Sequence, residues 1–514
     1  MKNGCSRCSV RKNPGRVLCA LLVLFIAQLP VLAGGKSEME TSGGNTISGK
    51  PAKYVFLFIG DGMAMPQISS AEIYAEALAS KDIKIRKLGF SRFPVSGLTT
   101  TYDAGSFITD SASAGTALAS GNKTLNGVVN MDPGKTEKFR TIAEYARDKG
   151  MKVGVVSSVS LDHATPAVFY AKVPSRGNYY DIGVQLSDSG FDYFGGGGFL
   201  QRTGKKGDQR DIFDIAKEKG YQIVDTREAF SALKPGAGKV IAVNETLQDS
   251  SAMPYDIDRA EGDLSLSDFT AKGIELLSDD PDGFFMMVEG GKIDWACHAN
   301  DAAASIRDTI AFDRAIDKAV AFADKHPGET LIIVTGDHET GGMTIGFAGT
   351  QYATFFDKAG LQKMSFVAFD QKVLKPYKAE TPAAKAKLAD LLPAIQDAFG
   401  LSYDSLTAVQ KEQLELAFQR SMGNKIERSV QEDQYLLYGG YEPLTVKITQ
   451  IVNQTAGIGW TSYAHTGVPV ATFARGAHQE LFSGYYDNTD IFRKMAAAMA
   501  LDVSSGSSVK VAAK

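Results

Sequence analysis

Cysteine, tryptophan and histidine are scarce in this chain of 514 residues, which contains four, two and six of them. Three of the cysteines, Cys5, Cys8 and Cys19, lie in the first 33 residues, which have the pattern of a removable leader. Cys5-x-x-Cys8 is therefore no metal or redox motif of the mature protein, and Cys297 alone cannot form an internal disulfide. A chain of this length can bury a large core without disulfides.

The chain also lacks an excess of positive charge. Its formal net charge is −4 and its isoelectric point is about 6.0, so no basic footprint indicates nucleic-acid binding. It has no Gly-x-x-x-x-Gly-Lys-Ser/Thr loop for the phosphates of a nucleoside triphosphate. Hydrophobic residues make up 44% and charged residues 22%. This is a globular composition, which excludes a disordered, collagen-like or coiled-coil chain.

One long apolar run lies at the N-terminus. Five basic residues and no acidic one precede the mostly apolar run Val17–Leu32, and Val31 and Ala33 suit a cleavage site. This pattern predicts a secretory signal peptide over residues 1–33 and secretion across the inner membrane, with a periplasmic or extracellular destination. An uncleaved anchor is the alternative, but sixteen residues are short for a span of ~20. No second segment is long and apolar enough to cross a bilayer.

Short apolar runs alternate with helical stretches along the rest of the chain. Apolar runs without polar alternation are typical of strands covered on both faces, and they occur at 54–59, 152–156, 284–288, 331–334 and 468–473. Residues 302–324 and 141–149 have helical patterns. We therefore expect an α/β fold, a three-layer sandwich around a mostly parallel central sheet. The glycine run Gly195–Gly198 is expected to form a loose loop.

Residues 351–455 differ from this pattern. Pro382–Phe399 and Leu406–Arg420 are rich in Ala, Lys, Gln and Leu, which predicts a helical insertion or cap. The expected organisation is then a signal peptide (1–33), the first part of the core (34–350), the insertion (351–455), the last part of the core (456–502) and a flexible tail (503–514).

Acidic residues follow three of the predicted strands. Asp61, Glu289 and the pair Asp337-His338 each come directly after an apolar run. Ligand sites of open α/β sheets lie at the carboxyl ends of strands. Each acid alone could be a helix cap or turn former, but clustered carboxylates repel one another unless cations neutralise them.

The histidines strengthen the case for a metal site. Asp294 and His298 have the i, i+4 spacing that places two ligands on one helix face. A lone histidine is more often a hydrogen-bonded core or surface residue, but His298, His338 and His465 together favour metal binding. Mixed Asp and His sets suit zinc, whereas oxygen-only sets suit magnesium.

A candidate nucleophile lies between an extended stretch and a helix of small residues. Ser111, in Thr109-Asp110-Ser111-Ala112, would lie at the N-terminus of that helix, where free N–H groups favour an anion. The alternative is that Ser111 is only the N-cap. The serine has no Gly-x-Ser-x-Gly elbow around it, which weighs against an α/β-hydrolase.

Six segments together resemble the alkaline phosphatase family across nearly the whole mature chain. They are Phe58–Met63, Thr109–Ala112, His163–Ala167, Val288–Asp294, Thr335–Gly342 and His465–Gly467. All six occur in the family's order. The resemblance implies a metal-dependent phosphomonoesterase that acts on small phosphate monoesters and forms a homodimer in many members.

The resemblance also implies roles for individual residues. Ser111 matches the nucleophile that becomes a phosphoserine, and Arg176 matches the arginine that grips phosphate. One zinc would be bound by Asp294, His298 and His465, and a second by Asp61, Asp337 and His338. A third metal, magnesium in most members, would be bound by Asp61, Thr165 and Glu289. His163 and Trp295 occupy positions that vary in the family and leave the identity of the third metal open.

Two other functions stay open at this stage. A phosphodiesterase, sulfatase or phosphoglycerate mutase could use the same metal core. A sulfatase, however, would need Cys/Ser-x-Pro-x-Arg where this chain has Ser111-Ala112-Ser113-Ala114, and a diesterase would lack a clamp such as Arg176. The other alternative is a non-enzymatic periplasmic binder of metal or phosphate.

Overall fold

The protein is described by a computed structural model that covers residues 49–504 except residue 81 and residues 424–430. The predicted signal peptide and residues 505–514 of the predicted tail lie outside the described residues. Within the described part, none of the helices is long and apolar enough to span a membrane.

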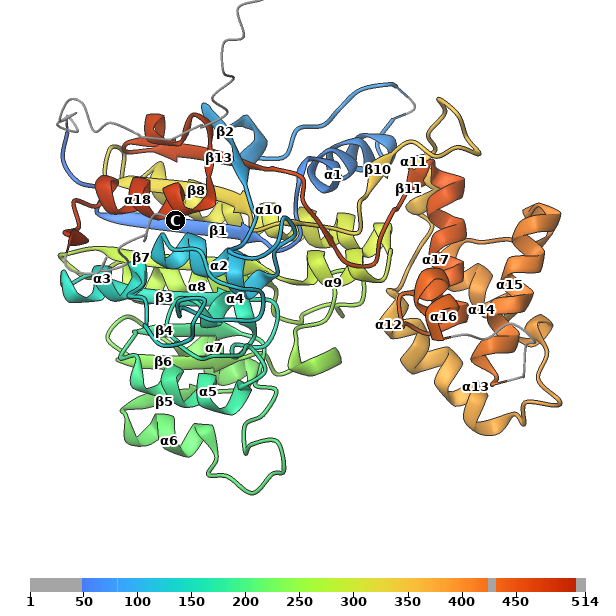
Figure 1. The fold of residues 1–514 in the computed structure, drawn as a ribbon, viewed down its shortest axis with the longest axis horizontal. Coiled ribbons are helices and arrows are strands. Elements are labelled where there is room, and N and C mark those ends of the chain that lie inside the picture. The colour runs from blue at the N-terminus through green and yellow to red at the C-terminus, as the bar shows by residue number, and fades with distance from the viewer. Residues whose placement is uncertain (1–48, 81, 424–430, 505–514) are drawn as a thin grey trace, which may run out of the picture. The chain divides into compact units, whose positions relative to one another are not determined.

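A mixed sheet of 10 strands runs through the molecule in the order β14-β2-β13-β8-β1-β7-β3-β4-β6-β5 (Figure 1). The strands are β1 (Tyr54–Gly60), β2 (Val95–Thr100), β3 (Lys152–Ser157), β4 (Tyr193–Gly196), β5 (Tyr221–Val224), β6 (Lys239–Val243), β7 (Phe284–Gly290), β8 (Thr330–Gly336), β13 (Val470–Gly476) and β14 (Gly484–Asp487). Neighbours are parallel except at β13, which is antiparallel to β2 and β8.

Both faces of the sheet are covered by helices. All seven residues of β1 are buried; Val55 and Leu57 belong to one apolar cluster, and Phe56 and Phe58 to another. The first cluster includes residues of α2 (Ser111–Ser120), α3 (Ile142–Asp148), α5 (Tyr179–Asp188), α6 (Ile212–Glu218) and α18 (Asn488–Ala498). The second includes residues of α1 (Met65–Ala77), α8 (Leu266–Leu277) and α10 (Ala302–Ala323). The predicted three-layer α/β sandwich is confirmed.

The predicted strand at 468–473 begins two residues later than expected. Pro469 has no N–H to donate to a strand ladder, and β13 starts at Val470. The run of glycines expected as a loose loop is also different, because Gly195 and Gly196 lie in β4 and are buried.

A second group of helices follows β8, and Figure 1 labels α12 to α17 together in yellow to orange-red. The elements are β9 (Glu339–Thr340), β10 (Thr344–Ile345), α11 (Phe356–Ala359), α12 (Phe366–Phe369), α13 (Lys375–Glu380), α14 (Leu388–Phe399), α15 (Ala408–Ser421), α16 (Gln431–Tyr438), α17 (Pro443–Ala456), β11 (Ile458–Gly459) and β12 (His465–Thr466). Residues of α12, α14, α15 and α17 form an apolar cluster that includes Phe369, Leu391 and Ile448. The division into core and insertion at residues 351 and 455 stays a prediction.

Candidate active site

The ends of three neighbouring strands bring the strand-end acids together. Gly60 of β1 is in register with Gly290 of β7 and with Gly336 of β8. Asp61, Glu289 and Asp337 therefore reach the same edge of the sheet, and each is at most 1% exposed. This is the edge at which ligand sites of parallel sheets form.

Asp61, Thr165 and Glu289 form an oxygen-rich group. The Thr165 hydroxyl, on α4 (Ala164–Ala167), donates to Asp61 Oδ2 over 3.1 Å, and the Ser157 hydroxyl donates to Glu289 Oε2. Asp61 Oδ1 and Glu289 Oε1 are buried and accept no hydrogen bond from the described residues. Burial and neighbouring carboxylates raise the pKa of Asp61 well above its usual range, and burial raises that of Glu289 to about 7. Such a set of unpaired oxygens suits a bound cation.

Asp294, His298 and His465 form a second group, and Asp294 and His298 lie one turn apart on α9 (Lys292–His298). His298 Nε2 lies 3.3 Å from Asp294 Oδ2 and 3.2 Å from His465 Nε2. His298 Nδ1 lies 2.5 Å from the Tyr463 carbonyl oxygen and His465 Nδ1 lies 2.7 Å from that of Thr109. A proton on each Nδ1 would leave both Nε2 atoms free to bind a metal.

Asp61, Asp294 and His338 form a third group next to the second. One ligand atom from each of these residues lies within 4.8 Å of the other two, as in the second group. Asp337 joins them, because His338 Nε2 lies 3.2 Å from its Oδ2, which has no hydrogen-bond partner among the described residues. Asp337 Oδ1 is held by the backbone N–H groups of Gly62 and His338. Asp294 therefore belongs to both the second and the third group, each of which contains a histidine.

Charge balance at Asp294 differs from that at Asp61. Burial alone would raise the pKa of Asp294, but His298 and His465 outweigh it and hold this pKa well below its usual range. Burial lowers the pKa of His298, but Asp294 outweighs this effect and the pKa rises to about 9. Without a metal, a proton on the imidazole therefore supplies the positive charge that Asp294 needs.

Ser111 is the first residue of α2 and faces the third group. Its hydroxyl oxygen lies 3.2 Å from His338 Nε2. The helix is capped by Asp110, whose side chain accepts from the Ser113 N–H over 2.9 Å. The alternative that Ser111 is the N-cap is therefore wrong, and its hydroxyl, which does not cap the helix, lies at the helix N-terminus where an anion is favoured.

Arg176 is held next to Ser111 by Asp110. Arg176 Nη1 donates to Asp110 Oδ2 over 3.0 Å, and Nη2 lies 3.4 Å from His163 Nε2. Burial would raise the pKa of Asp110, but Arg176 and two backbone N–H groups lower it. Burial lowers the pKa of His163 to about 3, so this imidazole is neutral. It packs edge-on against Trp295, with ring centroids 5.5 Å apart.

The site opens into a cavity of about 340 Å³. Its lining includes Ser111, Arg176 and the second group of donors, Asp294, His298 and His465. Sequence reasoning missed four of the lining residues, which are Asp249, Ser250, Phe366 and Tyr441. The available signal is weak: Asp249 is paired with the fully buried Lys292, which follows the recognised Glu289-Gly290-Gly291 segment.

Comparison with known proteins agrees with this geometry. The family model described as alkaline phosphatase matches residues 52–501. Alkaline phosphatase 3 of Bacillus subtilis is 30% identical over 506 residues, which is 96% of this chain and 99% of the relative.

Solved structures give the same result. A cold-active alkaline phosphatase from Shewanella sp. is 29% identical, with a TM-score of 0.71 over 87% of this chain and 99% of the other. A variant of the alkaline phosphatase from the Antarctic bacterium TAB5, with Mg bound in its M3 site, is 26% identical, with a TM-score of 0.61 over 88% and 99%. The chain thus belongs to the alkaline phosphatase family and is a phosphoric monoester hydrolase.

Proposed function

We propose that this enzyme hydrolyses phosphate monoesters through a covalent phosphoserine on Ser111, with two zinc ions and one magnesium ion as cofactors. The observation that carries the proposal is the position of the Ser111 hydroxyl, 3.2 Å from His338 Nε2 and in one cavity with Arg176, Asp294, His298 and His465. A nucleophile, an anion clamp and metal-type donors therefore face the same space.

The donor chemistry supports the choice of metals. The nitrogen and oxygen donors of Asp294, His298 and His465, and those of Asp61, Asp337 and His338, fit zinc. The oxygens of Asp61, Thr165 and Glu289 fit magnesium, and the TAB5 variant holds magnesium in its M3 site. When bound, the cations would supply Lewis-acid stabilisation of negative charge and lower the pKa of a water molecule.

The residues of the chain carry the reaction through two displacements at phosphorus. Arg176 binds two non-bridging oxygens of the substrate with its planar guanidinium, and Asp110 fixes the direction of that group. Ser111 Oγ gives its proton to solvent and forms a bond to phosphorus while the bond from phosphorus to the alcohol oxygen breaks, and that oxygen takes up a proton from solvent to leave as the alcohol. Water then attacks the phosphoserine, which releases inorganic phosphate and restores the hydroxyl. The N-terminus of α2 favours the anionic group throughout.

Two neighbouring functions are less well supported. A phosphodiesterase has a monoanionic substrate, whereas Arg176 and the N-terminus of α2 offer positive charge suited to a dianion. A non-enzymatic binder of metal or phosphate would not need a serine hydroxyl at this position. The leader pattern supports a periplasmic or extracellular location, and the family resemblance supports a homodimer; both belong to the proposal.

Phosphoenzyme trapping tests the nucleophile. We expect Ser111→Ala to bind metals normally, to lose hydrolysis of a chromogenic phosphate monoester by roughly 10³-fold or more, and to form no acid-stable phosphoprotein. Ser113→Ala is the matched control, because Ser113 lies on the same helix turn and should keep the phosphoserine. A phosphate trapped on any residue other than Ser111 would contradict the proposal.

Metal removal and add-back test the cofactors. Chelation should abolish monoester hydrolysis, zinc alone should restore part of it, and zinc with magnesium should restore all of it. Under the same conditions a phosphate diester should be turned over more slowly than the monoester. Faster turnover of the diester would favour the diesterase alternative, and binding of phosphate without any turnover would favour a binder.

A further inference from the structure

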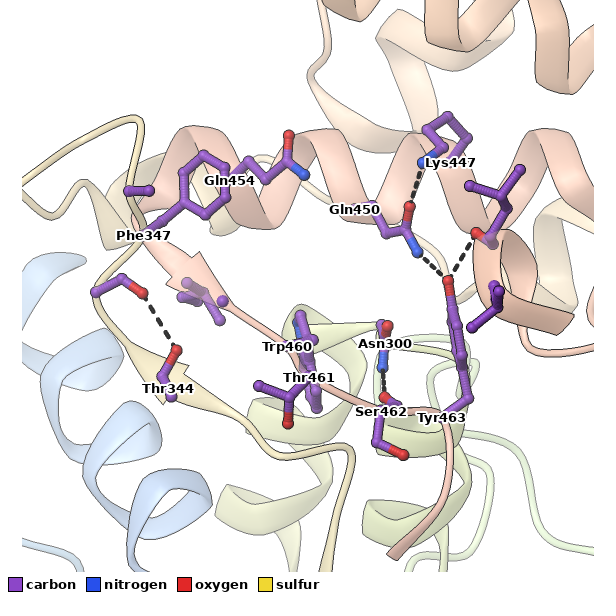
Figure 2. A pocket seen from close by; sticks show the side chains of 16 residues that line it. Asn300, Thr344, Phe347, Lys447, Gln450, Gln454, Trp460, Thr461, Ser462 and Tyr463 are labelled. Carbon is purple, nitrogen blue, oxygen red and sulfur yellow. Dashed lines mark hydrogen bonds between the residues drawn. The ribbon is translucent and has the colours of Figure 1, made fainter. Parts of the chain in front are cut away.

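A second and larger cavity, of about 440 Å³, shares no lining residue with the active-site cavity. Its walls come from α17, from the paired β10 and β11, and from the segment between β11 and β12 (Figure 2). Figure 2 shows Trp460 between Thr344 on one side and Asn300 and Tyr463 on the other, with Gln450 and Gln454 of α17 opposite. Nothing in the proposed phosphatase reaction uses this cavity.

The cavity carries a buried positive charge for which the described residues offer no counter-ion. Lys447 is only 8% exposed, and its ammonium group donates to Gln450 Oε1 over 2.5 Å. Among the described residues no carboxylate lies within ion-pair distance of Lys447, and no acidic residue lines the cavity. Burial lowers the pKa of Lys447 to about 8, so most of the protein carries this charge at pH 7. The ammonium also lies 5.7 Å from the centroid of the Tyr438 ring. A buried ammonium whose described contacts are an amide oxygen and an aromatic ring favours an anionic ligand.

Gln450 and Tyr463, two other polar residues of the cavity, are committed to hydrogen bonds within the protein. Gln450 Nε2 donates to the Tyr463 hydroxyl over 2.5 Å, and that hydroxyl donates to the Leu437 carbonyl oxygen over 2.7 Å. Trp460 Nε1 is buried and has no hydrogen-bond partner among the described residues. The donors that the cavity offers with support from these contacts are therefore the remaining protons of the Lys447 ammonium.

The remaining lining is aromatic and aliphatic, with Phe347, Trp460 and Ile458 among its members. A volume of about 440 Å³ lies in the range of ~300–1,000 Å³ typical of small-molecule sites. One ammonium and neutral donors suit a monoanion, whereas a phosphate dianion would call for a second cation.

We propose that this cavity is a binding site for a small organic carboxylate with a planar apolar body. The carboxylate pairs with the Lys447 ammonium, and the planar body packs against the Trp460 indole. The site is separate from the phosphate site, so both can be occupied at once. Its near wall also supports the active site, because the Tyr463 carbonyl oxygen lies 2.5 Å from His298 Nδ1 and the Ser462 carbonyl oxygen accepts from Asn300 Nδ2.

The test uses 2-naphthoate as the probe and neutral 2-naphthamide as its uncharged match. Both are titrated into zinc- and magnesium-loaded enzyme saturated with inorganic phosphate, with binding followed by calorimetry and by quenching of tryptophan fluorescence. We expect naphthoate to bind at least tenfold more tightly than naphthamide, with the same affinity in the absence of phosphate. Equal affinity of the two probes, no binding of naphthoate, or its displacement by phosphate would each overturn the proposal.

A substitution then locates the site. Lys447→Met keeps the length of the side chain and removes the charge, so it should weaken naphthoate binding at least tenfold and leave naphthamide binding and monoester hydrolysis unchanged. Lys375→Met, on the exposed surface of α13, is the matched control and should change neither. Unchanged naphthoate affinity in Lys447→Met would overturn the proposal. The comparison of the two probes on unaltered enzyme decides the question even if Lys447→Met fails to fold.

Discussion

Three carboxylates at the sheet edge are fully buried and carry oxygens that accept no hydrogen bond among the described residues. These oxygens belong to Asp61, Glu289 and Asp337. Burying an ionised carboxylate without a partner costs several kcal/mol of folding free energy in proteins. A neutral side chain of the same shape at that position would avoid most of this cost. Unpaired buried carboxylates of this kind suit a bound cation, and the neighbouring His338 and Thr165 offer further donor atoms for one.

The contact between Asp110 and Arg176 leads to a prediction about phosphate affinity. Asn is as good an N-cap as Asp, so Asp110→Asn should keep α2 intact while it removes the ion pair to Arg176. The freed guanidinium should bind the substrate less well, which would raise KM for a monoester and the inhibition constant of phosphate about threefold to tenfold.

Steady-state kinetics and metal analysis check this prediction. Asp132→Asn is the control, because Asp132 also holds several backbone N–H groups but lies outside the active-site cavity. An unchanged KM with a lowered kcat would contradict a positioning role for Asp110. A loss of bound zinc would contradict it as well, since Asp110 belongs to none of the proposed ligand sets.

The position of several candidate residues at the sheet edge could be predicted from the sequence for a physical reason, while their roles stay a prediction. Asp61, Asp337 and His338 directly follow strands whose continuous apolar runs are easy to read, so their place at the sheet edge follows from the fold class. Phe366 and Tyr441 reach the same cavity from the helical region after β8, through long-range packing. No local pattern around them distinguishes them from core aromatics, so the sequence alone could not identify them.

At the scale of elements, close approaches of the backbone position the proposed metal ligands. A Cβ atom on Gly336, the last residue of β8, would lie 2.1 Å from the Met63 carbonyl oxygen. Glycine at this position lets β8 pass the turn that carries Asp61 and deliver Asp337 and His338 to the edge. Gly196 of β4 is also at a close approach of the backbone, because a Cβ atom there would lie 1.8 Å from the Ser157 carbonyl oxygen.

Gly336→Ala is therefore expected to destabilise the enzyme and to weaken metal binding together. The backbone must move to relieve the overlap, at a cost of about 1–3 kcal/mol, and the shift displaces the two ligands that follow. Gly177→Ala is the matched control, because its Cβ would meet only a serine side-chain oxygen at 3.5 Å. Thermal unfolding and zinc content are the measurements, and a variant with normal zinc content would contradict the idea.

The elements differ in how far their sequence predicts them. Strands such as β1 and β7 read as continuous apolar runs because both faces are covered. The antiparallel direction of β13 does not follow from its residues, since a buried strand has the same composition in either direction. Gly195 and Gly196 were expected in a loop because glycine favours turns; here glycine is needed because neighbouring strands and loops pass too close for a side chain.

At the scale of the whole molecule, the fold class and the order of the functional segments could be predicted, and the order of strands could not. Strand order depends on which strands pair across hundreds of residues, as β1 does with β7 and β8. The apolar cluster formed by α12, α14, α15 and α17 is likewise a result of tertiary packing. The edge that gathers the ligands exists only when this whole arrangement has formed, so metal binding and folding are expected to be coupled.

Metal removal should therefore lower the unfolding temperature, and by more at pH 8.5 than at pH 7. Without metals, burial raises the pKa of Glu289 in the folded protein to about 7. The folded protein therefore holds a stabilising proton on this carboxyl at lower pH and loses it as pH rises through 7, whereas the carboxyls of the unfolded chain are already ionised. Protons no longer neutralise the cluster, and cations must do so. At a metal concentration about 1,000 times Kd, linkage contributes ~4 kcal/mol, or about 5–10 °C. Calorimetry measures the difference in unfolding temperature between the metal-loaded and the chelated enzyme. In Glu289→Gln this difference should depend less on pH. A difference that becomes smaller above pH 7 in the unaltered enzyme would contradict the coupling of metal binding to folding.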